Sequence, residues 1–228
     1  MKLIFDFDDT IFDTKRFKYE YFFKCLEKYG ISSEKFEESY LAQRKKDKVY
    51  DLNTHLSELI SKINPPITPN DVISNIKKDM QDYIFPEFKS VSNTYGKDNI
   101  FIITHGEINF QQLKIDASRI GDYVARVIIV GGSKQKEIEA LCAKYSDEKL
   151  FFFDDKFEYV VMDNIPNNLI CVFVGDVASL SEEQRSELEK RNIKVCIRGE
   201  LPQVIQKYAE ENKIESIKNL NEGSPKMI

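Results

Sequence analysis

The sequence predicts an α/β protein, in which a doubly wound parallel sheet carries an inserted block of helices. The second half of the chain alternates short, continuous apolar runs with helical patterns, as parallel strands joined by crossover helices do. A further strand pattern opens the chain at residues 3–5, whereas residues 14–86 show helical patterns only. The sequence therefore indicates a core formed by residues 1–13 and 87–228, with residues 14–86 inserted after the first strand.

Composition and charge limit the classes of function. Of the 228 residues, 42% are hydrophobic and 31% are charged, which is ordinary for a folded globular protein. The net charge of −5 argues against a nucleic-acid surface, and no apolar run is long enough to span a bilayer. The cysteines are widely spaced, which is typical of reduced thiols; they are Cys25, Cys142, Cys171 and Cys196. We expect a cytoplasmic protein with neither a nucleic-acid nor a membrane partner.

Five strand patterns are expected after the helical region. Each is a short run rich in β-branched and aromatic residues without a helical period. They cover residues 99–104, 125–130, 150–153, 169–174 and, more briefly, 193–197. Helical patterns lie between them, and Ser181 with Gln184 forms a capping box that opens the helix before the last strand.

Four helices are predicted between the first two strands, over about residues 15–29, 33–46, 54–64 and 69–83. The start of the last helix is the clearest boundary, since Thr68 suits the N-cap, Pro69 the first helical position and Asp71 the third. Asn53 or Thr54 is the expected cap of the third helix.

Acidic residues follow the first strand at once. The apolar run Leu3-Ile4-Phe5 ends in Asp6, and Asp8, Asp9 and Asp13 come soon after. Carboxylates this close together repel one another, and a cation that prefers oxygen ligands, such as Mg²⁺, would hold them ionised. Because ligands of open α/β sheets bind beyond the carboxyl ends of the strands, we expect Asp6 and Asp8 to project into a site.

Three other strands end in residues suited to phosphate chemistry. Thr104 ends the second strand, and its hydroxyl group and the amides of His105 and Gly106 can bind phosphate oxygens. Lys134 opens a helix after the third strand, where its ammonium group can reach the same oxygens. The acid pair 154–155 ends the fourth strand and can supply further carboxylates for the cation.

The segment Asp6-Phe7-Asp8-Asp9-Thr10 resembles motif I of the haloacid dehalogenase (HAD) superfamily, which is Asp-x-Asp-x-Thr after an apolar strand. Thr104, Lys134 and the acid pair 154–155 are similar to motifs II, III and IV and follow in the same order. The resemblance implies the Rossmann-like core of that superfamily, a C1-type helical cap formed by residues 14–86, and phosphatase-like chemistry.

The resemblance also implies a role for each site residue. Asp6 would be the nucleophile that forms an aspartyl-phosphate, and Asp8 would be the general acid and base. Mg²⁺ would be held by Asp6, the backbone carbonyl of Asp8 and Asp155, with Asp154 next to them. Thr104 and Lys134 would complete the catalytic set. The residues implied to bind phosphate are Asp9, Thr10, Thr104, His105, Gly106 and Lys134.

Some assignments stay open at this stage. Lys136 can take the place of Lys134, and either acid of the pair 154–155 can be the direct metal ligand. Asp176, after the fifth strand, is a second candidate for motif IV. Tyr159 stands where the family often has a further acid.

The function predicted is that of a Mg²⁺-dependent phosphomonoesterase acting on a small phosphorylated metabolite. A phosphomutase of the same fold would use the same residues. A phospho-receiver domain would place its acid pair and phospho-acceptor on different strands, and nothing supports a non-catalytic binding module, since no core motif residue is missing. Selectivity is expected from the helical cap. Its candidate residues are Gln43, Arg44, Lys45, Lys46, Lys48, Tyr50 and His55, although a solvated helix face is the simpler explanation of the basic run. The sequence indicates neither the substrate nor the oligomeric state.

Overall fold

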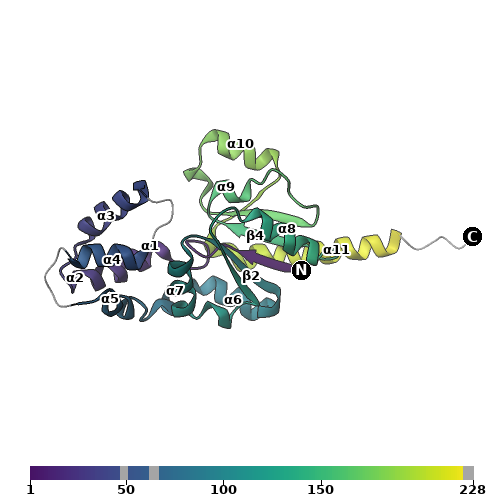
Figure 1. The fold of residues 1–228 in the computed structure, drawn as a ribbon. Coiled ribbons are helices and arrows are strands. Elements are labelled where there is room, and N and C mark those ends of the chain that lie inside the picture. Colours follow the sequence, from purple (N-terminus) through teal and green to yellow (C-terminus); the bar gives the residue numbers. More distant parts are fainter. Residues whose placement is uncertain (47–50, 62–66, 223–228) are drawn as a thin grey trace, which may run out of the picture.

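A six-stranded parallel sheet forms the core of the chain, of which the computed structural model describes residues 1–46, 51–61 and 67–222. The strand order is β3-β2-β1-β4-β5-β6 (Figure 1). The strands are β1 (Lys2–Phe5), β2 (Ile100–His105), β3 (Arg126–Val130), β4 (Leu150–Asp154), β5 (Leu169–Val174) and β6 (Lys194–Cys196). The α/β fold class and the six predicted strands are therefore confirmed.

β1 occupies the middle of the sheet, because both of its edges are paired. Ile4 lies opposite Phe101 of β2 and Phe152 of β4. The strand order reverses here, since the chain continues to β2 on one side of β1 and reaches β4 on the other. In open sheets of this kind a binding crevice lies beyond the carboxyl ends of the strands at the reversal, so the residues after β1 are placed at such a crevice.

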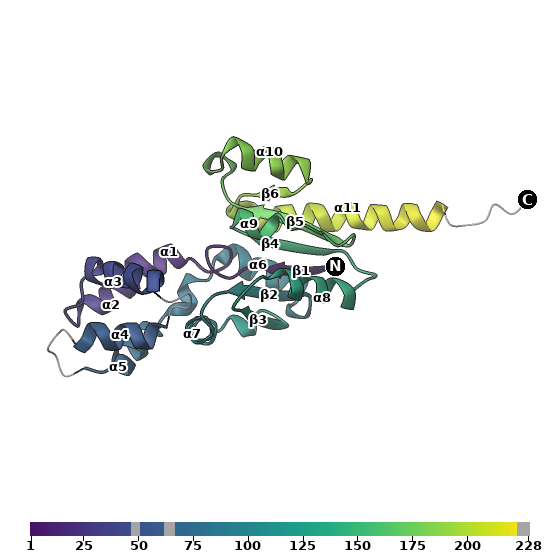
Figure 2. The same cartoon turned by 45° about the horizontal axis from the view of Figure 1, so that its top comes forward.

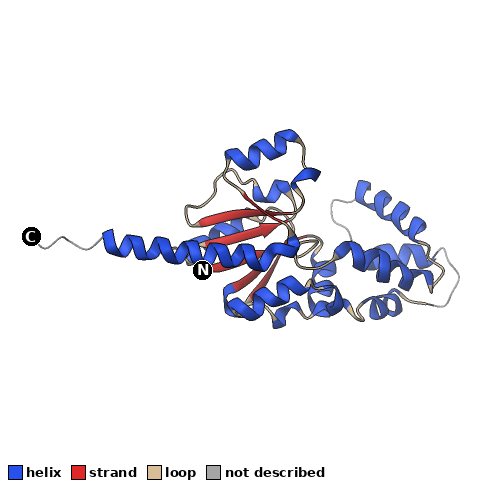
Figure 3. Cartoon of the chain, turned by 180° about the vertical axis from the view of Figure 1, so that it is seen from behind, coloured by secondary structure: helices blue, strands red, loops and turns tan. Residues whose placement is uncertain are grey.

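Helices cover both faces of the sheet. Leu3 and Phe5 are buried together with residues of α6 and α11 on one face, whereas Ile4 is buried together with residues of α8 and α10 on the other. The core helices are α6 (Pro86–Tyr95), α7 (Ile108–Ser118), α8 (Gln135–Lys144), α9 (Phe157–Val160), α10 (Glu182–Lys190) and α11 (Leu201–Glu222), with the short turns η3 (Lys97–Asn99), η4 (Ile120–Asp122), η5 (Val177–Ser179) and η6 (Arg198–Glu200). Figure 3 shows the long C-terminal helix α11 crossing one face of the strands. Among the described residues, no helix has the length and apolar character needed to cross a bilayer.

The chain between β1 and β2 begins with the helical block, by which we mean the described residues of 14–84. It contains α1 (Thr14–Arg16), η1 (Phe17–Phe22), α2 (Phe23–Glu27), α3 (Ser33–Lys46), α4 (Leu52–Ser61), α5 (Pro69–Ile76) and η2 (Met80–Tyr83). The first three continue one another as a single helical path, with η1 in π-helical geometry. The block lies to one side of the sheet, where η2 packs against α7 (Figure 2).

The helix starts in this block follow local capping. The hydroxyl group of Thr68 accepts a hydrogen bond from the Asp71 amide, and the Asp71 carboxylate accepts one from the Thr68 amide, so the predicted capping box is confirmed. The start of α4 was predicted at Asn53 or Thr54, which is wrong. Asp51 is the cap, because its carboxylate accepts a hydrogen bond from the Thr54 amide at 2.8 Å.

The last helix of the block is shorter than predicted. α5 ends at Ile76 because Asp79, three residues later, adopts a left-handed conformation with a φ of 60° and so leaves the helical path. Residues 80–83 form the separate turn η2, in which Met80 and Tyr83 are buried.

Two chain segments connect the block to the core, and they run side by side. The amide of Asp13 donates to the carbonyl of Tyr83 at 2.8 Å, and the amide of Phe85 donates to the carbonyl of Ile11 at 2.9 Å. The block is therefore attached next to the loop that follows β1.

Candidate active site

The carboxyl ends of β1 and β4 and the start of α8 bring three charged side chains together. They belong to Asp6, Asp154 and Lys134, and all three are buried. The ammonium group of Lys134 donates to Asp6 Oδ1 at 2.5 Å and to Asp154 Oδ2 at 2.6 Å. Lys136 is exposed, so the geometry selects Lys134 of the two lysines left open by the sequence.

Three carboxylates, those of Asp6, Asp154 and Asp155, form what we call the acidic cluster. One oxygen atom of each lies within 4.8 Å of the others. Burial, and next the negative charge of Asp6, raise the pKa of Asp154 to about 8 and that of Asp155 to about 7. Burial also raises the pKa of Asp6, against the opposing effect of Lys134. The fold thus gathers more negative charge than one lysine neutralises, and a divalent cation would hold all three acids ionised.

Three buried oxygen atoms at this site have no hydrogen-bond partner among the described residues, and they are Asp155 Oδ1, Thr104 Oγ1 and Gln111 Oε1. Unpaired buried polar atoms are rare and costly, so each indicates a missing ligand. Asp154 differs, because its two oxygens accept hydrogen bonds from Lys134 and from the Lys156 amide. The residues present therefore fit Mg²⁺, with Asp155 as the freer ligand of the pair, and fit a phosphate oxygen at Thr104.

The carboxylate of Asp8 is held by three donors. Thr14 Oγ1 donates to it at 2.6 Å, Gln111 Nε2 at 2.8 Å, and Lys114 Nζ at 2.5 and 2.7 Å. Burial alone would raise the pKa of Asp8, but the charge of Lys114 and the hydrogen bonds outweigh burial and hold that pKa below its usual range. Asp8 is consequently ionised in this arrangement.

The sequence did not predict these three donors to Asp8. Gln111 and Lys114 come from α7, at the same buried face as Ile115 and Ser118. A glutamine and a lysine at helical spacing on an otherwise buried face were the only signal available, because long polar side chains are seldom buried without a partner. Which partner they find depends on how α7 packs beside the loop after β1.

In the structure Asp9 and Thr10 stabilise the loop after β1, a role that the sequence did not predict, and their part in phosphate binding stays a prediction. Asp9 has a φ of 55°, its amide donates to the Phe12 carbonyl at 2.8 Å, and its own carbonyl accepts a hydrogen bond from Arg198. The hydroxyl group of Thr10 accepts a hydrogen bond from the Asp155 amide at 3.1 Å. Thr10 thereby holds the backbone of the acid pair in place.

Gly106 also differs from its predicted role. Its amide donates to the Val130 carbonyl at 3.1 Å and extends the sheet pairing instead of facing a phosphate group. A Cβ atom at this position would lie 2.7 Å from the Gln111 side chain. Glycine therefore leaves the space in which Gln111 reaches Asp8.

Tyr159 covers Lys134, a contact that the sequence did not predict. The ammonium group lies 4.3 Å from the centre of the Tyr159 ring, and the His105 ring lies 5.9 Å from the same ring. Burial, and next the positive charge of Lys156, lower the pKa of His105. Position 159 thus supplies an aromatic wall to the site, where the family pattern would have supplied an acid.

The remaining candidates are engaged elsewhere. Asp176 caps the turn η5 with its side chain, and Gln43 donates to Glu58 at 3.0 Å inside the helical block. His55 is 0% exposed, and its Nε2 atom lies 2.6 Å from the Ser39 hydroxyl oxygen, so it packs inside the block. Outside the described residues lie the side chains of Arg44, Lys45 and Lys46, together with Lys48 and Tyr50.

Comparisons with known proteins bear on the fold. No protein-family model and no curated protein matches the sequence. A haloacid dehalogenase-like hydrolase from Burkholderia xenovorans has a similar solved structure, with a TM-score of 0.64, 20% identity, and coverage of 88% of this chain and 96% of that one. The chain has the haloacid dehalogenase fold.

Two further solved structures with the haloacid dehalogenase fold are also similar to this chain. A protein from Thermotoga maritima assigned as a β-phosphoglucomutase gives a TM-score of 0.53 at 13% identity, over 91% of this chain and 99% of that one. A haloacid dehalogenase-like hydrolase from Xanthomonas campestris gives 0.51 at 12% identity, over 94% of each chain. At these identities the haloacid dehalogenase fold is what the comparisons establish, and chemistry has to be argued from the site.

Proposed function

We propose that this protein is a Mg²⁺-dependent phosphomonoesterase, which hydrolyses a small phosphorylated metabolite through an aspartyl-phosphate. One observation carries the proposal. The buried carboxylate of Asp6 is paired with Lys134 and stands among further carboxylates and the unpaired hydroxyl group of Thr104. These are the groups that phosphoryl transfer to a carboxylate requires. The fold shared with hydrolases supports an enzyme rather than a binding module.

In this mechanism Asp8, which is ionised in the free enzyme, first takes up a proton from solvent when the substrate binds. Asp6 then attacks the phosphorus atom, and the bond from phosphorus to the leaving oxygen breaks as Asp8 gives that oxygen the proton. Asp8, now ionised, then takes a proton from the water molecule that attacks the aspartyl-phosphate, which releases phosphate and regenerates Asp6. Lys134 and Thr104 bind oxygens of the transferred group, and Mg²⁺ bound at the acidic cluster would neutralise part of its charge. The three donors to Asp8 favour its ionised form, which is the form needed for the second step.

The covalent intermediate provides the test. We expect acetyl phosphate to be hydrolysed in the presence of Mg²⁺, and borohydride added during turnover to convert Asp6 to homoserine, which peptide mass spectrometry detects. Asp6→Asn should abolish both the hydrolysis of acetyl phosphate and the formation of homoserine, because a carboxamide is a poor nucleophile. Asp163→Asn, an exposed acid in the loop after α9, is the matched control and should keep both. Turnover in Asp6→Asn, or homoserine at another position, would refute the mechanism.

A further inference from the structure

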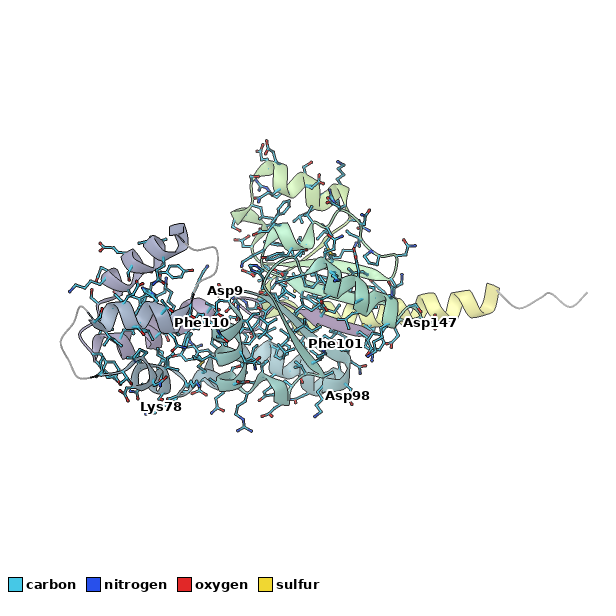
Figure 4. All side chains as sticks on the ribbon, viewed as in Figure 1. Asp9, Lys78, Asp98, Phe101, Phe110 and Asp147 are labelled. Carbon is cyan, nitrogen blue, oxygen red and sulfur yellow. The ribbon has the colours of Figure 1, made fainter. Side chains whose placement is uncertain are left out.

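A pocket of about 180 Å³ lies between the helical block and α7. Its aromatic lining residues come from η1, α3 and α7, and they are Phe17, Phe22, Phe36, Tyr40 and Phe110. We call it the aromatic pocket. The three phenylalanines of the block are almost fully buried, whereas Tyr40 and Phe110 are half-buried. Figure 4 shows Phe110 at the boundary between block and core.

The aromatic pocket adjoins the proposed general acid. Thr14 and Lys114 line it, and both donate to the carboxylate of Asp8, at 2.6 Å from Thr14 and at 2.5 and 2.7 Å from Lys114. Asp8 is the group that would protonate the leaving oxygen. The part of a substrate that continues from that oxygen therefore has this pocket as its neighbour.

The polar side chains of the pocket already have partners. Lys18 and Glu37 form an ion pair at 2.6 Å, while Thr14 and Lys114 are bonded to Asp8. Most of the surface that hydroxyl groups of a sugar would meet here is apolar, and a buried hydroxyl group without a partner is strongly disfavoured. An aromatic ring has the opposite character, since it packs against other rings in stacked or edge-to-face geometry.

We propose that the aromatic pocket binds the leaving group, and that the preferred substrates are phosphate monoesters of alcohols bearing a single aromatic ring. The size agrees, because an apolar cavity of about 150 Å³ is known to hold benzene. This inference rests on the proposed function and adds the substrate class to it. It also assigns substrate selectivity to the aromatic side chains of η1, α3 and α7 rather than to the basic run of α3.

Two primary phosphate esters test the preference, and a third compound separates it from the proposed function. Benzyl phosphate and glucose 6-phosphate both release a primary alkoxide oxygen, so a difference in kcat/KM reports the group attached to it. We expect benzyl phosphate to be favoured about tenfold or more. Equal values, or a preference for the sugar phosphate, would overturn the inference. Acetyl phosphate lacks a ring, so its hydrolysis without any preference for benzyl phosphate would refute the pocket assignment alone. Failure on all three compounds would refute the proposed function.

Variants locate the preference in the pocket. Phe110→Ala and Tyr40→Ala should each lower the ratio of kcat/KM for benzyl phosphate to that for glucose 6-phosphate by roughly three- to tenfold, through lost ring contacts. They should weaken the binding of benzylphosphonate, measured by calorimetry, by a similar factor. Tyr19→Ala is the matched control, because Tyr19 is 59% exposed on η1 and does not line the pocket. Two variants are made so that, if one of them does not fold, the other still tests the inference. An unchanged ratio in a folded variant would overturn the inference.

Discussion

Lys114 donates to both carboxylate oxygens of Asp8, at 2.5 and 2.7 Å, across 106 positions of the chain. The side chain of Lys114 is 5% exposed and that of Asp8 is 21% exposed, so the pair is largely withdrawn from water. Breaking such a pair is unfavourable, because one partner is left as a buried charge without compensation. The pair therefore ties α7 to the loop after β1 through the residue that we assign as general acid and base.

The Lys114→Met variant tests this dependence. We expect it to lower the free energy of unfolding by about 2 kcal/mol, since Asp8 loses its charged partner but keeps two neutral donors. In the Asp8→Asn background the same substitution should be neutral or stabilising, because it then removes a buried unpaired ammonium group. Urea unfolding of the two single variants and the double variant gives the coupling energy. Equal effects of Lys114→Met in both backgrounds would show that the pair contributes nothing.

Asp8→Asn should separate the two proton transfers. With benzyl phosphate we expect kcat to fall by about 10²–10⁴-fold, because the leaving alkoxide is no longer protonated. Acetate leaves without a proton, so acetyl phosphate should still phosphorylate Asp6, while hydrolysis of the intermediate becomes slow. Borohydride trapping should then yield more homoserine at position 6 than in the wild type. Less trapped intermediate from acetyl phosphate would contradict the assignment of Asp8 as the base.

The fold could be predicted from the sequence because the signals for its elements are local. The continuous apolar run of β4 and the capping box at Thr68 each depend on a few adjacent residues. Parallel sheets place all carboxyl ends on one edge, so the meeting of Asp6, Lys134 and Asp154 also followed from their positions after strands.

Other parts of the site depend on packing between distant elements, which the sequence pattern does not encode. Lys114 reaches Asp8 only through the way α7 lies beside the loop after β1. Phe17 and Phe36 have the helical spacing of ordinary core residues, and only the assembled structure leaves a pocket between them and Phe110. From the sequence, the Gly106 amide could donate to a phosphate group. In the structure it donates to the Val130 carbonyl of β3 instead.

Removal of the metal should stop catalysis and loosen the acidic cluster. We expect EDTA to abolish hydrolysis of acetyl phosphate and Mg²⁺ to restore it, whereas Ca²⁺, which prefers more ligands at longer distances, should not. Mg²⁺ should also raise the melting temperature, because it binds only the folded arrangement of the three acids. Asp155→Asn should need more Mg²⁺ for both effects, while Asp163→Asn should behave as the wild type. Full activity in EDTA would exclude the cluster as a metal site.

His55 gives the helical block a pH dependence of its own. The ring is fully buried, with its centre 4.5 Å from that of Phe36, and burial lowers its pKa from 6.5 to about 4. The folded state therefore prefers the neutral imidazole, whereas the unfolded state takes up a proton near pH 6.5. The stability that this residue contributes is present above pH 6.5 and is lost as the pH falls from 6.5 towards 4.

The His55→Phe variant should remove that loss. Between pH 7 and pH 5 the difference in proton uptake at His55 amounts to about 2 kcal/mol of unfolding free energy in the wild type. Asp154 and Asp155 have raised pKa values and so act in the opposite direction, but their contribution is common to both proteins and cancels in the comparison. We therefore expect urea unfolding to show that the change in unfolding free energy from pH 7 to pH 5 is about 2 kcal/mol less favourable in the wild type than in His55→Phe. Equal changes in the two proteins would mean that His55 is protonated in the folded block and has room for its charge.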